Sequence, residues 1–233
     1  MITAVCYSRI IRPFPSTQSS NTIGFVCQAQ SQPLVIQTQS SNTLPIRRLI
    51  LLRHAKSSWK DRSLKDHDRP LSKTGEMDAI QVTYKLQQLG WIPQLILSRP
   101  INFVLKVLLV CYCSDAARTK QTLKIMQDQV RAFLEAEIHF ISSFYSVASM
   151  DGQTADHLQQ AICKYATDDI VTVMCMGHNR GWEEAASTFS GTPVELKTCN
   201  AALLEAAGKS WEEAFLLAGI GGWKMQQLVK PNT

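Results

Sequence analysis

Three short apolar runs constrain the fold of this chain more than any other feature. Residues 49–52, 95–97 and 170–176 are apolar almost throughout and are shorter than ordinary helices. Such runs are typical of strands that are buried on both faces, as in a parallel sheet. Helical patterns of apolar residues lie between them, so strands alternate with helices. We therefore expect an α/β fold of three layers, α/β/α, with a mostly parallel sheet.

Four amphipathic helices are expected to accompany these strands. Each begins after a Ser, Thr or Gly and carries apolar residues at helical spacing. Ser72 or Thr74 can cap the first, Ser114 the second and Thr154 the third, while Gly90 and Gly191 suit the positions just after two helix ends. The expected helices cover 73–89, 115–134, 155–165 and 182–190. Two later strands are expected at 201–205 and 223–229.

The first 45 residues differ from the rest of the chain in composition. They are rich in Ser, Thr, Gln and Asn, and the first acidic residue of the chain is Asp61. Such a composition is typical of an organelle transit peptide, and the small number of arginines favours a plastid over a mitochondrion. The alternative is a disordered tail of a cytoplasmic protein. We therefore expect a transit peptide at 1–45 and a folded domain at 46–233.

Charge and hydropathy argue against two classes of partner. Residues 1–48 contain four of the 24 basic residues and no acidic residue. The rest of the chain therefore has 20 basic and 19 acidic residues. The body is therefore nearly neutral, and no nucleic-acid partner is expected. The longest apolar run, 101–113, is too short to cross a bilayer and contains Lys106, so no membrane partner is expected.

Cysteine usage indicates neither a disulfide framework nor a metal site. The chain has seven cysteines, an odd number, and none forms a Cys-x-x-Cys pair. Free thiols in a reducing compartment are the simplest interpretation. We expect no cofactor and no metal.

The segment 99–113, RPINFVLKVLLVCYC, does not fit the alternation of strands and helices. Without it, Ser98 would precede Ser114 directly, which gives the short strand-to-helix loop that such units prefer. We interpret the segment as an insertion, from intron sequence or an alternative splice product. A rival interpretation is that 107–113 replaces 95–97 as the strand.

Imidazole and guanidinium groups follow the predicted strands. Arg53 and His54 come directly after the first apolar run, His178 follows the third, and Arg118 lies just inside the helix after the second. The carboxyl ends of parallel strands meet at one edge of a sheet, so these groups can converge there. A neutral imidazole can attack phosphorus, and arginine forks can hold the phosphoryl oxygens. The set predicts metal-independent phosphoryl transfer.

Four motifs carry a resemblance to a known family: LLRHAKSSW at 51–59, DHDRPLSKTG at 66–75, SDAARTKQT at 114–122 and VMCMGHNRG at 173–181. Through them, residues 48–230 resemble the histidine phosphatase, or phosphoglycerate mutase-like, superfamily, and most of all its SixA-type phosphohistidine phosphatase branch. The resemblance implies a hydrolase with His54 as the phosphorylated nucleophile. It implies Arg53, Arg118 and His178 as the rest of the phosphate pocket. The implied substrate is phosphohistidine or another phosphorylated protein side chain, with a small phosphoester as the alternative.

Two features depart from that family. The 99–113 insertion directly precedes the helix of Arg118 and can displace this arginine. Many members also carry a Glu general acid where this chain has residues 144–147, FYSV, so that the nearest carboxylate is Asp151. Asp151 is a candidate proton donor, although a turn at Asp151-Gly152 is the preferred interpretation. A labile phosphoramidate would need such an acid least, and the lack of a long lid segment suits a protein substrate.

Two other functions stay open at this point. The insertion and the missing acid allow a catalytically impaired phosphate-binding or interaction protein. A small-molecule phosphomutase is less expected, because such enzymes usually enclose the transferred group.

Several polar residues near the motifs have simpler interpretations than catalysis. Asp66-His67-Asp68 is interpreted as a solvated loop rather than a metal cluster. Arg69 and Lys73 are surface residues that can guide an anion. His139 and His157 are expected to be structural. Ser57 is an open candidate for a hydrogen bond to phosphate.

Overall fold

The computed structural model describes residues 44–98, 117–141 and 154–232. The predictions about the transit peptide at 1–45 therefore lie almost wholly outside the described residues. So do those about the 99–113 insertion, the Ser114 cap, the 144–147 segment and Asp151. They stay predictions.

A single mixed sheet forms the centre of the described fold. Its strands lie in the order β3-β2-β4-β1-β5-β6. Strands β1, β2, β3 and β4 pair in parallel, β5 pairs antiparallel with β1, and β6 pairs antiparallel with β5. Only β5 therefore runs against the others among the described strands, which confirms a mostly parallel sheet. The bounds are β1 Ile46–Arg53, β2 Leu95–Ser98, β3 Glu137–Phe140, β4 Thr172–Gly177, β5 Ala201–Ala207 and β6 Lys224–Val229.

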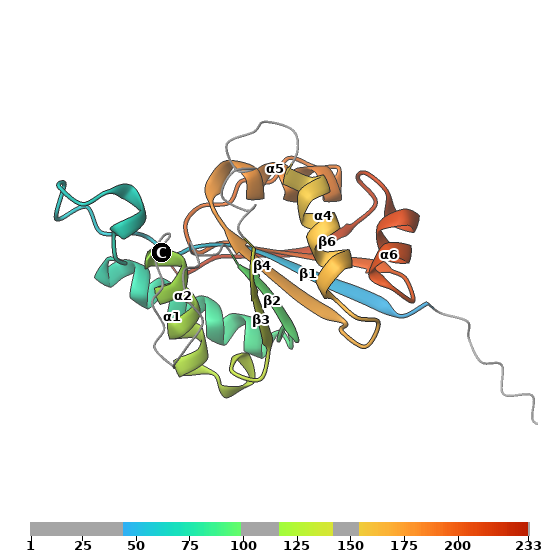
Figure 1. The fold of residues 1–233 in the computed structure, drawn as a ribbon, viewed down its shortest axis with the longest axis horizontal. Coiled ribbons are helices and arrows are strands. Elements are labelled where there is room, and N and C mark those ends of the chain that lie inside the picture. Colours follow the sequence, from blue (N-terminus) through green and yellow to red (C-terminus); the bar gives the residue numbers. More distant parts are fainter. Residues whose placement is uncertain (1–43, 99–116, 142–153, 233) are drawn as a thin grey trace, which may run out of the picture. The chain divides into compact units, whose positions relative to one another are not determined.

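Helices cover both faces of the sheet, as the expected three layers require (Figure 1). Helices α1 (Lys73–Gln88) and α2 (Ala117–Gln129) pack on one face. Helices α4 (Thr154–Tyr165), α5 (Asn179–Ser190) and α6 (Trp211–Ala218) pack on the other. Every one of these helices is too short or too polar to span a bilayer.

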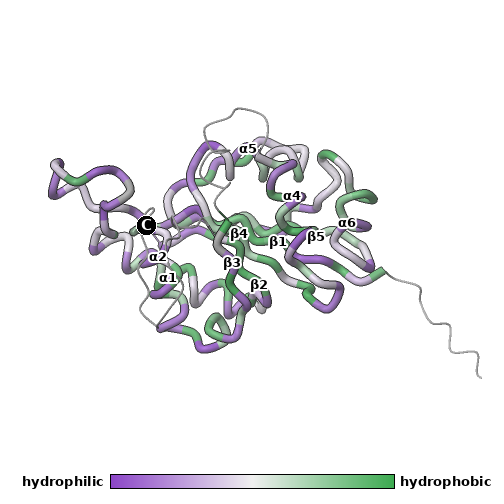
Figure 2. The backbone as a smooth tube through the Cα atoms, in the orientation of Figure 1, coloured by the Kyte–Doolittle hydropathy of each residue, from purple (hydrophilic) through white to green (hydrophobic). Residues whose placement is uncertain are grey.

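The sheet residues divide between two cores because strand side chains alternate in direction. In β1, Leu49 and Leu51 belong to the core under α4, α5 and α6, whereas Ile50 and Leu52 belong to the core under α1 and α2. The strand interior is the most hydrophobic part of the backbone trace (Figure 2). The double burial explains why these strands read as continuous apolar runs.

The three apolar runs form β1, β2 and β4, as predicted. The rival interpretation, in which 107–113 replaces 95–97, is wrong. Residues 95–98 are themselves the strand, paired in register with both β3 and β4.

Three predicted helix ends need correction. Helix α2 ends at Gln129 rather than near 134, because Val130 has an extended backbone and a 3₁₀ turn at Arg131–Phe133 follows. Thr154 is the first residue of α4 rather than its cap. Helix α5 begins at Asn179, two residues before Gly181, because the extended backbone of His178 makes that residue the N-cap.

Candidate active site

The two histidines of the motifs lie side by side because β1 and β4 are neighbours. Arg53, the last residue of β1, is in register with Gly177, the last residue of β4. The chain leaves both strands at the same edge, and the His54 amide donates to the Gly177 carbonyl at 3.1 Å. The rings of His54 and His178 consequently meet edge to face, with centroids 4.6 Å apart and an interplanar angle of 65°.

The hydrogen bond of His54 fixes its tautomer. Nδ1 lies 2.8 Å from the Ala55 carbonyl oxygen, which can only accept, so Nδ1 carries the proton. Nε2 is then the nitrogen with a free lone pair. Burial lowers the pKa of His54 to about 4, and the positive charges of Arg118 and Arg53 add to the effect. His54 is therefore a neutral imidazole at physiological pH.

Arg118 lies in the same cluster as the two histidines. Its guanidinium Nη2 is 3.5 Å from His178 Nδ1, and the residue is almost fully buried. Thr122, one turn later on α2, donates to the Arg118 carbonyl at 2.7 Å and accepts from the Ala55 amide at 3.1 Å. This hydroxyl fixes the helix of Arg118 against the residue that follows His54. The displacement of Arg118 that the insertion made possible is not seen.

A carboxylate that the sequence analysis did not assign to the site pairs with Arg118. Nη2 of Arg118 donates to Asp66 Oδ2 at 2.7 Å, and Nη1 donates to the Asp66 carbonyl oxygen at 2.6 Å. The hydrogen bond from Arg118 holds the pKa of Asp66 below its usual range. Asp66 is exposed, as expected for a solvated loop, but the expectation did not include its ion pair with Arg118. The motif at 66–75 marked the loop, but no periodicity or spacing joined it to an arginine 52 residues later.

Arg53 approaches the cluster from the other side. Its Nη1 donates to Asn179 Oδ1 at 2.8 Å and to the Leu196 carbonyl at 2.7 Å. Its Nε is buried and finds no acceptor among the described residues. Asn179 follows His178, so the start of α5 joins the second histidine to this arginine. The α5 N-terminus also contributes partial positive charge at this point.

The segment before β5 holds the backbone around His54. The Arg53 amide donates to the Asn200 carbonyl and the Cys199 amide donates to the His54 carbonyl, both at 3.0 Å. Cys199 has a φ of 60°, a backbone conformation that is strained for any residue other than glycine. Both strand neighbours of β1, β4 and β5, therefore fix the residue that carries the candidate nucleophile.

Two glycines of the motifs permit close approaches around the site. A Cβ at Gly75 would lie 2.2 Å from the Lys56 carbonyl oxygen, where α1 meets the loop after His54. A Cβ at Gly177 would lie 2.4 Å from the Trp182 ring. A larger residue at Gly75 would displace the loop after His54 from α1, and one at Gly177 would displace the Trp182 ring.

The remaining candidate residues lie outside this cluster. Ser57 forms an isolated bridge with Leu71 through its backbone, and its role toward phosphate stays a prediction. The Arg69 guanidinium stacks on the Trp59 ring at 3.7 Å. His139 contacts Glu137 and Tyr165, and His157 lies on α4. Within the described parts of the chain, no three His, Cys, Asp or Glu side chains are grouped to hold a metal.

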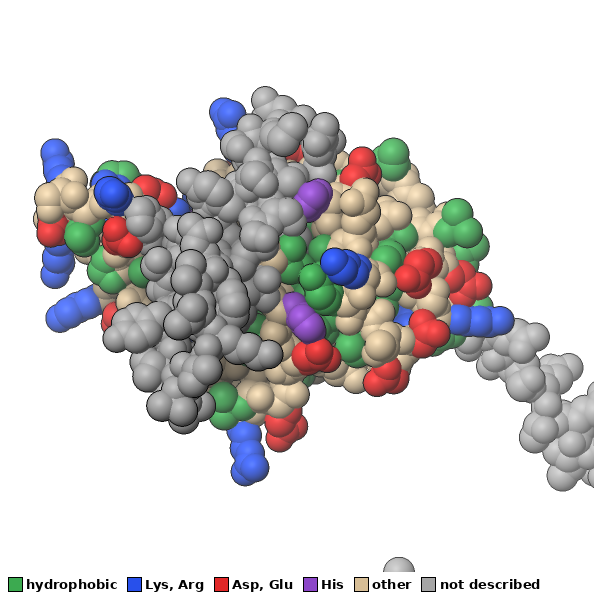
Figure 3. All heavy atoms as spheres, viewed as in Figure 1, with side chains coloured by type: hydrophobic (Ala, Val, Ile, Leu, Met, Phe, Trp, Pro, Cys, Tyr) green, Lys and Arg blue, Asp and Glu red, His purple; other side chains and the backbone are tan. Residues whose placement is uncertain are grey.

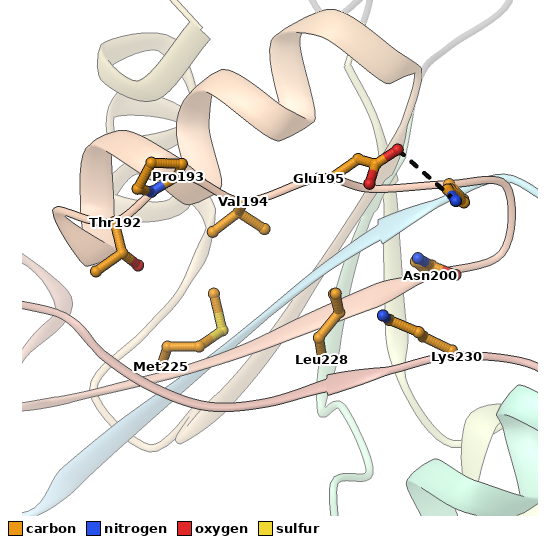
Figure 4. A pocket seen from close by; sticks show the side chains of 9 residues that line it. Thr192, Pro193, Val194, Glu195, Asn200, Met225, Leu228 and Lys230 are labelled. Atoms are coloured by element: carbon orange, nitrogen blue, oxygen red, sulfur yellow. Dashed lines mark ion pairs between the residues drawn. The ribbon is translucent and has the colours of Figure 1, made fainter.

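A hollow of about 240 Å³ opens near the same edge of the sheet (Figure 4). Val194, Met225 and Leu228 form its apolar part, and Lys230 stands at its rim in the close-up. Asn200 also lines it, and the carbonyl of Asn200 accepts from the Arg53 amide. The hollow is therefore lined in part by the same segment that holds the backbone around His54.

The fold has solved counterparts, although no protein-family model matches the chain. SixA from Agrobacterium tumefaciens superimposes with a TM-score of 0.55 at 21% identity, over 80% of this chain and 99% of that one. SixA from Nakamurella multipartitia gives 0.58 at 20% identity, over 82% and 100%. The protein histidine phosphatase SixA complexed with tungstate gives 0.53 at 14% identity, over 79% and 97%.

The chain therefore has the same fold as these SixA proteins. In sequence, an uncharacterized chloroplastic protein of Arabidopsis thaliana is 62% identical over 194 residues, which are 83% of this chain and 82% of that protein. The chain belongs to the same family as this plant protein.

Proposed function

We propose that this protein is a phosphatase that acts through a phosphohistidine formed at His54. The observation that carries the proposal is the bond from His54 Nδ1 to the Ala55 carbonyl, which leaves Nε2 unprotonated in a ring beside two arginines. A neutral imidazole with a fixed lone pair is the nucleophile that such a reaction needs. The SixA structures with the same fold support the proposal.

The reaction has two displacement steps at phosphorus. His54 Nε2 attacks the phosphoryl group and forms a P–N bond, while the bond from phosphorus to the leaving group breaks. Water then attacks the phosphohistidine, which releases inorganic phosphate and restores Nε2. Arg53 and Arg118 offset the negative charge in both steps. Because His178 Nδ1 accepts from Arg118, His178 Nε2 carries a proton and adds a donor.

The substrate that best suits this site is phosphohistidine or another phosphorylated protein side chain. The candidate acid Asp151 lies outside the described residues, and Asp66 is held ionised by Arg118. A phosphoramidate leaving group needs little acid assistance, so it suits a site with an ionised carboxylate. The tungstate bound in the SixA complex is a tetrahedral oxyanion, which supports a phosphate-sized ligand.

Hydrolysis of a phosphohistidine peptide tests this function. We expect the full chain to release inorganic phosphate in the presence of a metal chelator, and His54→Asn to lower kcat by at least about 10³-fold. His157→Asn, on α4, is the matched control and should keep the rate. Equal turnover by wild type and His54→Asn would contradict the proposal.

The same assay separates the two alternatives. An impaired phosphate-binding protein would show no turnover in the full chain but turnover in a variant that lacks residues 99–113. A phosphomutase would transfer phosphate between small substrates with little net release.

We also propose a plastid as the place of action, with mitochondrion and cytoplasm as alternatives. The acid-free composition of residues 1–45 and the chloroplastic name of the 62% identical relative support it. Import of a fusion protein that carries residues 1–45 into isolated chloroplasts is expected. Exclusion of this fusion would contradict the location.

A further inference from the structure

Arg118 already binds an anionic group of the protein itself. Both of its terminal nitrogens are engaged by Asp66, Nη1 by the carbonyl at 2.6 Å and Nη2 by the carboxylate at 2.7 Å. An arginine binds a phosphoryl group most strongly when two parallel N–H groups point at two oxygens. While both contacts to Asp66 persist, one N–H group of each terminal nitrogen is already used, and a substrate can bind only the N–H groups of Arg118 that remain.

The two partners differ sharply in exposure. The Arg118 side chain is 9% exposed, whereas the Asp66 side chain is 68% exposed. Arg118 is further fixed because the Thr122 hydroxyl donates to its backbone carbonyl. Asp66 is therefore the partner that can break the ion pair and move away, because water can hydrate its exposed carboxylate.

The segment that carries Asp66 projects away from the sheet and is exposed to solvent. Residues 59–66 are all exposed, and they form part of the loop that projects at the left of Figure 1. Basic and acidic side chains both gather on this projection (Figure 3). Its exposed basic residues are Lys60, Arg62 and Lys65. A short 3₁₀ turn, Asp66–Asp68, ends the projection beside Arg118. Movement of the turn would uncover the guanidinium without disturbing a buried strand.

We propose that Asp66 is an internal competitor for Arg118, and that a phosphoryl group binds by taking its place. The inference rests on the proposed phosphatase function and adds a positioning residue to the site. In the resting protein Asp66 compensates the buried charge of Arg118 and keeps it beside His178. A phosphoryl group carries more charge and more acceptor oxygens than a carboxylate, so it can complete the exchange. A ligand with a single carboxylate would gain little from displacing Asp66, because it carries the same charge as the Asp66 side chain.

Titration of the full chain with inorganic phosphate tests the exchange. Asp66→Asn keeps the shape of the side chain but removes its charge. We expect it to lower the Kd for phosphate by roughly fivefold, the scale of a partly exposed ion pair. KM for a phosphohistidine peptide should fall with it, while kcat changes little. Asp61→Asn is the matched control, since Asp61 lies on the same projection and its carboxylate accepts from the neighbouring Ser63. It should leave the Kd unchanged.

A double-mutant cycle separates exchange from a general change in charge. In an Arg118→Ala background, Asp66→Asn should no longer alter the Kd, because the competition is lost with the arginine. An equal gain in both backgrounds would overturn the proposal. So would weaker or unchanged phosphate binding by Asp66→Asn, or no phosphate binding by any form. These results are independent of turnover, so a failure of the exchange is distinguishable from a failure of the phosphatase function.

Discussion

Strand β1 carries a buried arginine near its start and a half-buried arginine at its end, and the two are bonded differently. Near the start, Arg47 is 2% exposed and donates to three carbonyl oxygens, those of Gly208, Asp168 and Ile170. At the end, Arg53 Nη1 bonds the Asn179 side chain and the Leu196 carbonyl, and its buried Nε finds no acceptor among the described residues. The Arg47 guanidinium joins β1 to the backbone of other segments. The Arg53 guanidinium keeps one N–H group without an acceptor among the described residues.

The difference teaches how to separate a structural arginine from a binding one. Backbone carbonyls satisfy Arg47 permanently, because no ligand could displace three of them without opening the fold. Arg118, like Arg53, has a buried Nε without an acceptor in the described part of the chain, and its terminal nitrogens bond an exposed loop residue. We therefore expect anion binding at the carboxyl end of the sheet and not at the opposite end.

Loss of Arg118 is expected to have the largest effect on catalysis. Arg118→Ala should lower kcat/KM by about 10²- to 10³-fold, the range for a lost charge-stabilising donor. Steady-state phosphate release from a phosphohistidine peptide measures this. A rate within threefold of wild type, at unchanged stability, would place the anion site elsewhere and break the comparison.

The lowered pKa of His54, at the carboxyl end of the sheet, also predicts that the stability of the fold depends on pH. Burial and the two site arginines lower the pKa of His54 to about 4, against about 6.5 in the unfolded chain. Between these values the unfolded state binds more protons, so the free energy of unfolding falls as pH decreases. The loss from His54 amounts to roughly 3 kcal/mol over that window. Urea unfolding at pH 6.5 and pH 4 measures it, and His54→Asn should remove this part. An identical pH dependence in both proteins would argue against a neutral, buried His54.

Loss of Arg47 is expected to act on stability alone. Arg47→Met removes hydrogen bonds to three carbonyls, of which that of Ile170 still accepts from Trp211 Nε1. The change should lower the free energy of unfolding by about 2 kcal/mol. The kcat/KM of the folded variant should stay near the wild-type value. Urea unfolding and the peptide assay, made on the same preparation, give both quantities. A large fall in kcat/KM at full stability would show that the two ends of β1 are not separate in function.

Much of the sheet was predictable because burial on both faces leaves a plain pattern. Runs such as 49–52 admit no polar residue, and Ser72 and Gly90 bound α1 as expected. Edge strand β3 was missed because Glu137 and His139 interrupt its apolar residues. Helix α6 was missed although the Ser-x-x-Glu spacing of Ser210 and Glu213 was an available indication. In the structure the Glu213 amide donates to Ser210 Oγ, while the Glu213 carboxylate accepts from the Lys209 amide.

The residues of the candidate site could be predicted from the sequence, but the hydrogen bonds between them could not. His54, His178, Arg53 and Arg118 follow strand ends, and the topology brings them together. The pairing of Asp66 with Arg118 joins a loop to a helix 52 residues away, and local pattern holds no information on it. Nor does the sequence distinguish Arg47 from Arg53, because their difference lies in which carbonyls reach them.

Trapping the covalent intermediate tests the central claim most directly. Rapid quenching in base during turnover of a phosphohistidine peptide, followed by peptide mass analysis, locates any phosphoryl group on the enzyme. We expect one acid-labile, base-stable phosphoryl group on His54, and none in His54→Asn. Steady release of phosphate with no label on His54, or with label on another residue, would contradict nucleophilic catalysis by this histidine.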